Sequence, residues 1–208
     1  MAGVGSSNES DWKLAVSDAA VQALSGMGFA TIKAVLVFDR LKLTDDERTA
    51  MLEQLAWFVP KELIFGFNGF GQISTETNNT DITILVLAGN IEVQASLSDL
   101  GQDDNPYLHS GRQLCEAVTK QIANTPPGYH HVAILLGDMH VPDHDTVTIP
   151  FKDLVQRGVI VTGAAHPREG CLFYRGEIRH RHCMSLLVSG DFRCKNFMEQ
   201  GKGLEGTV

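Results

Sequence analysis

The chain has 208 residues, and its 17 lysines and arginines against 25 aspartates and glutamates give a formal net charge of -8. This balance argues against a nucleic-acid binder, which needs a basic face for phosphate contacts, and against attraction to an anionic membrane surface. No apolar run approaches the roughly 20 residues that a membrane helix needs. The composition, 43% hydrophobic and 20% charged, predicts one globular domain over residues 11–198, with flexible polar tails at 1–10 and 199–208.

The predicted elements are strands and amphipathic helices that alternate along the chain and give way to short strands near its end. In chain order they are a strand at 12–17, a helix at 18–27, a strand at 33–38, a helix at 44–59, strands at 62–68, 82–88 and 91–97, a helix at 108–123, a strand at 130–137, a helix at 150–157, a strand at 158–165 and three short strands within 171–197. This order predicts an α/β fold, a mixed β-sheet layered with helices, whose C-terminal third is rich in β-hairpins.

Local signals mark several of these elements. Thr44 followed by Glu47 forms a capping box, so a helix is predicted to begin there. The dipeptide Gly89-Asn90 is a tight-turn signal and predicts a hairpin between the strands on either side. Turns are also expected at 175–176 and 189–191, between the three short strands.

The cysteines and the first residues of the sequence give an expectation for the cellular compartment. The opening MAGVGSSNESD has neither the basic nor the apolar region of a secretory signal. The four cysteines lie far apart and form no C-x-x-C pair: Cys115, Cys171, Cys183 and Cys194. Reduced thiols in a cytoplasmic protein are therefore expected, most of them serving as small buried hydrophobes.

Three segments resemble, in their order and spacing, the N-terminal module of the FIST family (F-box and intracellular signal transduction proteins). The first runs from KAVLVF to LIFGFNGFGQIS, the second is ITILVLAG with the strand after it, and the third is GVIVTGAAH followed by CLFYRGEIRHRHCMSLLVSGDFR. Together they cover most of residues 12–198. The resemblance implies an intracellular sensory module that binds a small ligand and passes the signal to an output protein. Some members of the family are described as haem-binding nitric-oxide sensors.

A glycine-rich turn at 66–72 follows one predicted strand, and two further strand ends carry a single glycine each, at 137–140 and 163–166. Glycines let backbone N–H groups approach a ligand closely, and ligands of open α/β sheets bind at the carboxyl ends of strands. A small-ligand pocket is therefore predicted where these ends meet, and its expected lining is Asn68, Gly69, Gly71, Gln72, Gly163, Ala164, His166 and Arg168. The alternative interpretation is that the glycines only permit tight turns.

The loop after residue 137 holds the densest group of metal-capable side chains. Asp138, His140 and His144 are the candidate ligands, because imidazole and carboxylate suit zinc, iron or manganese. Pro142 opposes a helix between the two histidines, so a solvated surface loop is the competing interpretation. One axial histidine is enough for haem, and His166 is the first choice for it. The cofactor is thus left open between haem and a divalent metal.

Three functions follow from these features, and no catalytic residue is assigned. The first is a non-catalytic sensory module that binds a small molecule. The second is an enzyme for a small polar or anionic substrate, with His140 and Asp138, or His166, as acid and base and Arg168 orienting the substrate. The third is a scaffold subunit without a ligand. The edge strands of such a sheet allow a homodimer.

Overall fold

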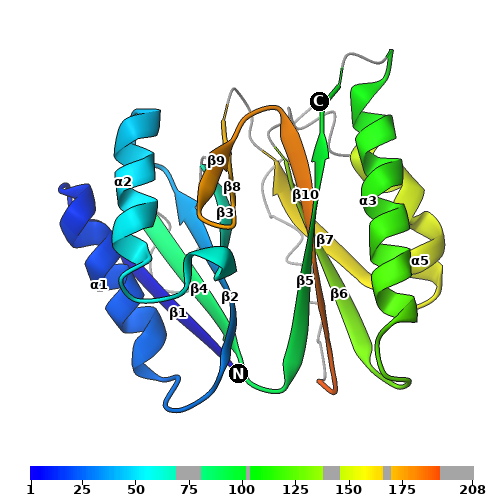
Figure 1. Cartoon of the computed structure of the whole chain (residues 1–208), viewed down its shortest axis with the longest axis horizontal. Coiled ribbons are helices and arrows are strands. Elements are labelled where there is room, and N and C mark those ends of the chain that lie inside the picture. The colour runs from blue at the N-terminus through cyan, green and yellow to red at the C-terminus, as the bar shows by residue number, and fades with distance from the viewer. Residues whose placement is uncertain (69–80, 102–103, 138–145, 166–169, 193–208) are drawn as a thin grey trace, which may run out of the picture.

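A computed structural model describes residues 1–68, 81–101, 104–137, 146–165 and 170–192, and it has four layers (Figure 1). Two β-sheets pack face to face in the middle, and helices cover the outer face of each sheet. The predicted α/β class, a mixed sheet layered with helices, is confirmed. The strands divide into two sheets because their apolar residues have to be covered on both faces.

The first sheet has six strands, and two helices cover its outer face. Its strand order is β1 (Ala2–Ser7), β4 (Ile82–Ala88), β2 (Ile32–Asp39), β3 (Ile64–Asn68), β8 (Leu172–Tyr174) and β9 (Glu177–Arg179). Only β2 and β3 run parallel, and every other neighbouring pair is antiparallel. The covering helices are α1 (Trp12–Ser25) and α2 (Asp45–Leu55), and the short 3-10 helix η1 (Lys61–Leu63) leads into β3.

The second sheet has four strands in the order β5 (Ile91–Asp99), β10 (His182–Gly190), β6 (His130–Gly137) and β7 (Ile160–Ala165). Here β6 and β7 run parallel, while β10 pairs antiparallel with both β5 and β6. Its outer face is covered by α3 (Pro106–Ala123), the 3-10 helix η2 (Ile149–Phe151) and α5 (Lys152–Gln156). The inner faces of both sheets meet in an apolar core that includes Leu36, Leu136, Leu172, Met184 and Leu186.

The N-terminal segment differs from its prediction. Residues 1–10 were expected as a tail and 12–17 as a strand, but β1 pairs along its whole length with β4, and α1 begins at Trp12. Asp11 caps this helix, because its carboxylate accepts a hydrogen bond from the Lys13 backbone N–H at 2.8 Å. The apolar residues of 12–17 therefore follow helical rather than strand periodicity. Residues 199–208 lie outside the described part of the chain.

Two segments predicted as hairpin turns differ from that prediction in the structure. Gly89 and Asn90 do connect β4 and β5, but these strands belong to different sheets, so the turn links the two sheets instead of closing a hairpin. The expected turn at 189–191 falls on β10, where Ser189 and Gly190 still pair with β5 and β6. The chain turns earlier, at Arg181, which has a positive φ of 55°.

The parallel strands of both sheets end on the same side of the molecule. In Figure 1 the arrows of β2, β3, β6 and β7 all point toward the top of the view. This edge of the sandwich is where the sequence predicted a ligand, and α2 begins beside it. Among the described residues, no helix combines the length and the apolar character needed to cross a membrane.

Candidate functional site

Asn68 and Asp39 lie side by side at the carboxyl ends of the parallel strands β3 and β2. The Asn68 side-chain nitrogen donates to the Asp39 backbone oxygen at 3.2 Å and to the Asp39 Oδ1 at 2.9 Å. Both partners are acceptors, so the nitrogen of the amide has to face Asp39 and the Asn68 Oδ1 faces away from it. Two bonds therefore fix the orientation of a half-buried amide at the end of β3.

The carboxyl group of Asp39 is shielded from water, with none of the residue exposed. Burial raises its pKa to about 6, against the lowering effects of the Asn68 hydrogen bond and the Arg48 charge. A buried carboxyl normally has hydrogen-bond partners for both oxygens. Within the described residues, however, the Asp39 Oδ2 has none.

Arg48, on α2, is the positive charge nearest to this carboxyl. Its Nε lies 3.8 Å from the Asp39 Oδ2, which is too long for a hydrogen bond, and this Nε likewise has no partner among the described residues. The other end of the guanidinium is held, because Nη2 donates to the Leu41 backbone oxygen at 3.2 Å and Nη1 lies 3.7 Å from the Asp45 Oδ1. Arg48 and Asp39 therefore attract each other electrostatically without a hydrogen bond, and both side chains are mostly buried.

His180 extends the same group of side chains from the corner between β9 and β10. Its Nε2 lies 2.8 Å from the Asp45 Oδ2, and its Nδ1 lies 3.3 Å from the Gly170 backbone oxygen. Both partners are acceptors, so both bonds form together only when the imidazole carries a proton on each nitrogen. We call Asp39, Arg48, Asp45, Asn68 and His180 the strand-end cluster.

Of the predicted ligand-binding residues, Asn68 lies in this cluster. Gly163 and Ala164 are on β7, the edge strand of the other sheet, where they pair with Leu135 and Leu136 of β6. The remaining predicted residues lie outside the described part of the chain: Gly69, Gly71, Gln72, His166 and Arg168, together with the predicted metal ligands Asp138, His140 and His144. The described residues themselves bring no three His, Cys, Asp or Glu side chains into a group that could hold a metal ion.

Sequence analysis missed the other four members of the cluster. Asp39 carried a usable signal, since it is a charged residue directly after the apolar run of β2. Asp45 and Arg48 follow the predicted cap at Thr44 as ordinary residues of the first helical turns, and His180 falls among the short strands predicted within 171–197. Asp45 and His180 are 135 positions apart, and no local pattern links them.

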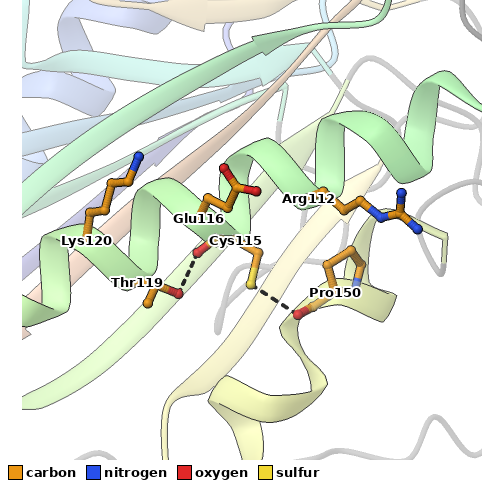
Figure 2. Close-up of a pocket in the computed structure, with 6 residues that line it drawn as sticks. All are labelled: Arg112, Cys115, Glu116, Thr119, Lys120 and Pro150. Atoms are coloured by element: carbon orange, nitrogen blue, oxygen red, sulfur yellow. Dashed lines mark hydrogen bonds between the residues drawn. The ribbon is translucent and has the colours of Figure 1, made fainter.

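A second hollow lies on the outer face of α3, between this helix and η2 (Figure 2). It has a volume of about 360 Å³, and Figure 2 shows the Cys115 thiol directed at Pro150, to whose backbone oxygen it donates at 3.1 Å. Burial, reinforced by the Asp153 and Glu116 charges, raises the pKa of the Cys115 thiol. A protonated thiol that is already hydrogen-bonded is a poor nucleophile.

No protein-family model and no curated protein matches the sequence. The likeness to the FIST module therefore stands on the three sequence segments alone, and the function has to be argued from the strand-end cluster.

Proposed function

We propose that the chain is a non-catalytic sensory module that binds a small polar ligand at the carboxyl ends of β2 and β3. One observation carries this proposal: the Asn68 amide, oriented by two bonds to Asp39, presents an Oδ1 that accepts no hydrogen bond from the described residues. A fixed acceptor at a strand end is the kind of group that gives a ligand its orientation. The ligand would offer a hydrogen-bond donor to it.

Asp39 and Arg48 support Asn68 rather than contact the ligand. Asp39 holds the amide, and Arg48 offsets the charge of a carboxyl that would otherwise be buried alone. Ordered polar groups of this kind are costly to bury, and they are concentrated at functional sites. The resemblance to the FIST family supports the sensory part of the proposal, including a cytoplasmic location and a signalling output protein as the partner.

The raised pKa of Asp39 favours a second candidate, an enzyme that uses this carboxyl as a general acid or base. A pKa of about 6 suits proton transfer near neutral pH. The geometry argues against it, because Oδ1 is bonded to Asn68 and Oδ2 is shielded from solvent. A catalytic group has to reach the substrate, so binding without catalysis is the better-supported function.

Haem also fits a sensory module, with His166 as the proposed axial ligand. His180, the histidine of the strand-end cluster, has both ring nitrogens within hydrogen-bond distance of acceptors and offers none to iron. An absorbance spectrum of the freshly purified chain separates the options. A Soret band would identify haem, and its absence would leave a colourless ligand.

Native mass spectrometry of the full chain, purified from cells, tests the proposed site. The expected result is a bound small molecule on the wild-type chain that is lost in Asn68→Ala. Asn90→Ala changes the same residue type on the exposed turn between β4 and β5, and it should keep the ligand. A chain that carries no small molecule, or equal occupancy in Asn68→Ala and Asn90→Ala, would contradict the proposal.

A further inference from the structure

A groove of about 460 Å³ lies between the two sheets, toward the amino ends of β2 and β3. One wall comes from β2, η1, β3 and the turn between β8 and β9, and the other from the edge strand β5 and the last turn of α3. We call it the inter-sheet groove. It is distinct from the strand-end cluster, because Phe65 lines the groove near the start of β3 and Asn68 ends that strand.

The groove has an apolar floor. Leu63, Phe65 and Val93 line it, and Phe65 is only 5% exposed. The Phe65 ring packs edge-on against Tyr174, with 5.8 Å between the ring centroids. The ring is therefore held in place and offers a rigid surface to the apolar part of a ligand.

Arg175 brings a positive charge to this floor from a strained position. It is the first residue of the two-residue turn between β8 and β9, and its φ is +53°, a region that non-glycine residues rarely adopt. Its guanidinium lies 5.6 Å from the centroid of the Tyr174 ring. Within the described residues the guanidinium forms no hydrogen bond or ion pair, so the contact with the Tyr174 ring is its one interaction there, at a position whose backbone suits glycine or asparagine better.

Lys33 brings a second positive charge to the groove, and it stands in a β-bulge rather than in a turn. The pairing of β2 with β4 shifts between Ile32 and Ala34, which leaves Lys33 as the extra residue of a bulge. A bulge re-aims a side chain, and Lys33 lines the groove. Like the Arg175 guanidinium, the Lys33 ammonium group has no hydrogen bond or ion pair to any of the described residues.

The other polar groups of the groove leave this positive charge in excess. Among the described residues that line it, Glu62 is the one carboxylate, against the two cations Lys33 and Arg175. Gln121 is held by a bond from its Nε2 to the Ser96 Oγ at 3.0 Å, and its Oε1 has no partner in the described part of the chain. A local excess of positive charge over an apolar floor is unusual in a chain with a net charge of -8.

We propose that the inter-sheet groove binds a small organic anion, whose apolar body packs on Phe65 while its anionic group lies between Lys33 and Arg175. Two unpaired cations that face one apolar surface recognise a molecule with both characters better than either a free inorganic anion or a neutral hydrocarbon. The site is independent of the ligand proposed for Asn68, and neither proposal depends on the other.

Calorimetric titration of the full chain with 3-phenylpropionate tests this inference. Its neutral analogue 3-phenylpropionamide keeps the apolar body and removes the charge, and acetate keeps the charge and removes the body. We expect 3-phenylpropionate to bind roughly tenfold more tightly than the amide, which is the effect of one charge-assisted contact. Acetate should bind more weakly still.

Three variants locate the site. Arg175→Asn should weaken the binding of 3-phenylpropionate severalfold, yet its unfolding temperature should equal or exceed that of the wild type, because asparagine tolerates the positive φ. Glu62→Gln should strengthen binding by removing a repulsion, and Arg157→Gln, which changes an exposed arginine next to α5, should leave it unchanged. Failure of 3-phenylpropionate to bind at millimolar concentration, equal affinity for the amide, or unchanged affinity in Arg175→Asn would each overturn the proposal.

Discussion

Asp39 carries a carboxyl group that the fold keeps from water, and it therefore ties the stability of the protein to pH. In the folded chain burial raises its pKa to about 6, whereas the unfolded chain ionises at the ordinary value of 3.8. The folded state thus binds this proton more tightly. The contribution of Asp39 to stability is largest below pH 3.8, falls as the pH rises toward 6, and stays low above it.

Asp39→Asn should flatten this dependence, because asparagine cannot ionise. Between pH 5 and pH 7.5 the carboxyl is expected to lower the free energy of unfolding by about 1.4 kcal/mol, the equivalent of one pKa unit. Urea denaturation at the two pH values measures the difference. Asp99→Asn, which changes an exposed carboxyl at the end of β5, is the control and should keep the wild-type slope. Equal slopes in wild type and Asp39→Asn would show that Asp39 does not titrate in this range.

The strand β1 packs closely against the helix α1. The backbone of β1 approaches the helix at Gly3 and Gly5, where a Cβ would overlap the carbonyl oxygens of Ala23 and Ala19. The facing residues of α1 are small as well, since Ala19 and Ala23 are completely buried. Small side chains on both elements let the strand lie directly under the helix.

Gly5→Ala should force these two elements apart. The neighbouring atoms belong to the backbone of a helix and cannot move aside, so we expect a loss of about 2–3 kcal/mol in the free energy of unfolding. Gly26→Ala is the matched control, because Gly26 has an ordinary negative φ of -92° and a Cβ there would meet nothing within 4 Å. A comparison of urea midpoints checks the expectation. If both variants unfold at the same urea concentration, the close contact is not what holds β1 to α1.

These elements also show how far sequence patterns predict the fold. The strands at 33–38 and 130–137 and the start of the capped helix that follows Thr44 were predicted correctly, because apolar periodicity and a cap are local signals. That helix ends at Leu55, four residues before its predicted end. The strand β1 was missed because its glycines and serines carry no apolar pattern. It is a strand because β4 and α1 offer it partners, and that information lies more than ten positions away in the chain.

The candidate site likewise contains residues that sequence patterns predict and residues that they do not. Asn68 could be predicted because strand ends and glycine-rich turns are visible in the sequence. Arg48 and His180 reach Asp39 and Asp45 only through tertiary packing, so residue spacing gives no hint of their meeting. Lys33 and Arg175 are similar cases, because a bulge and a left-handed residue depend on how the strands pair.

At the scale of the whole molecule, the question is whether the two sheets unfold together. Each sheet has a core of its own beneath its helices, and the third core lies between the sheets. The chain crosses between the sheets from β4 to β5, from β7 to β8 and from β9 to β10, but covalent links alone bury no apolar surface. Cooperation between the layers therefore depends on the core between the sheets, where Leu186 of β10 and Leu36 of β2 are both buried.

Leu186→Ala tests this dependence, because tryptophan fluorescence follows the six-stranded sheet while the substitution lies in the four-stranded sheet. Trp12 of α1 packs against the core beneath the helices of the six-stranded sheet, whereas Leu186 lies in the other sheet. The second tryptophan, Trp57, is 84% exposed, so the change in fluorescence reports mainly on Trp12. Removing the leucine should cost about 3 kcal/mol through lost contacts and the remaining cavity. If the molecule is one cooperative unit, tryptophan fluorescence and far-UV circular dichroism should shift to the same lower urea midpoint. A fluorescence midpoint that stays at the wild-type value while the dichroism shifts would mean that the two sheets unfold independently, and the chain would then hold two domains.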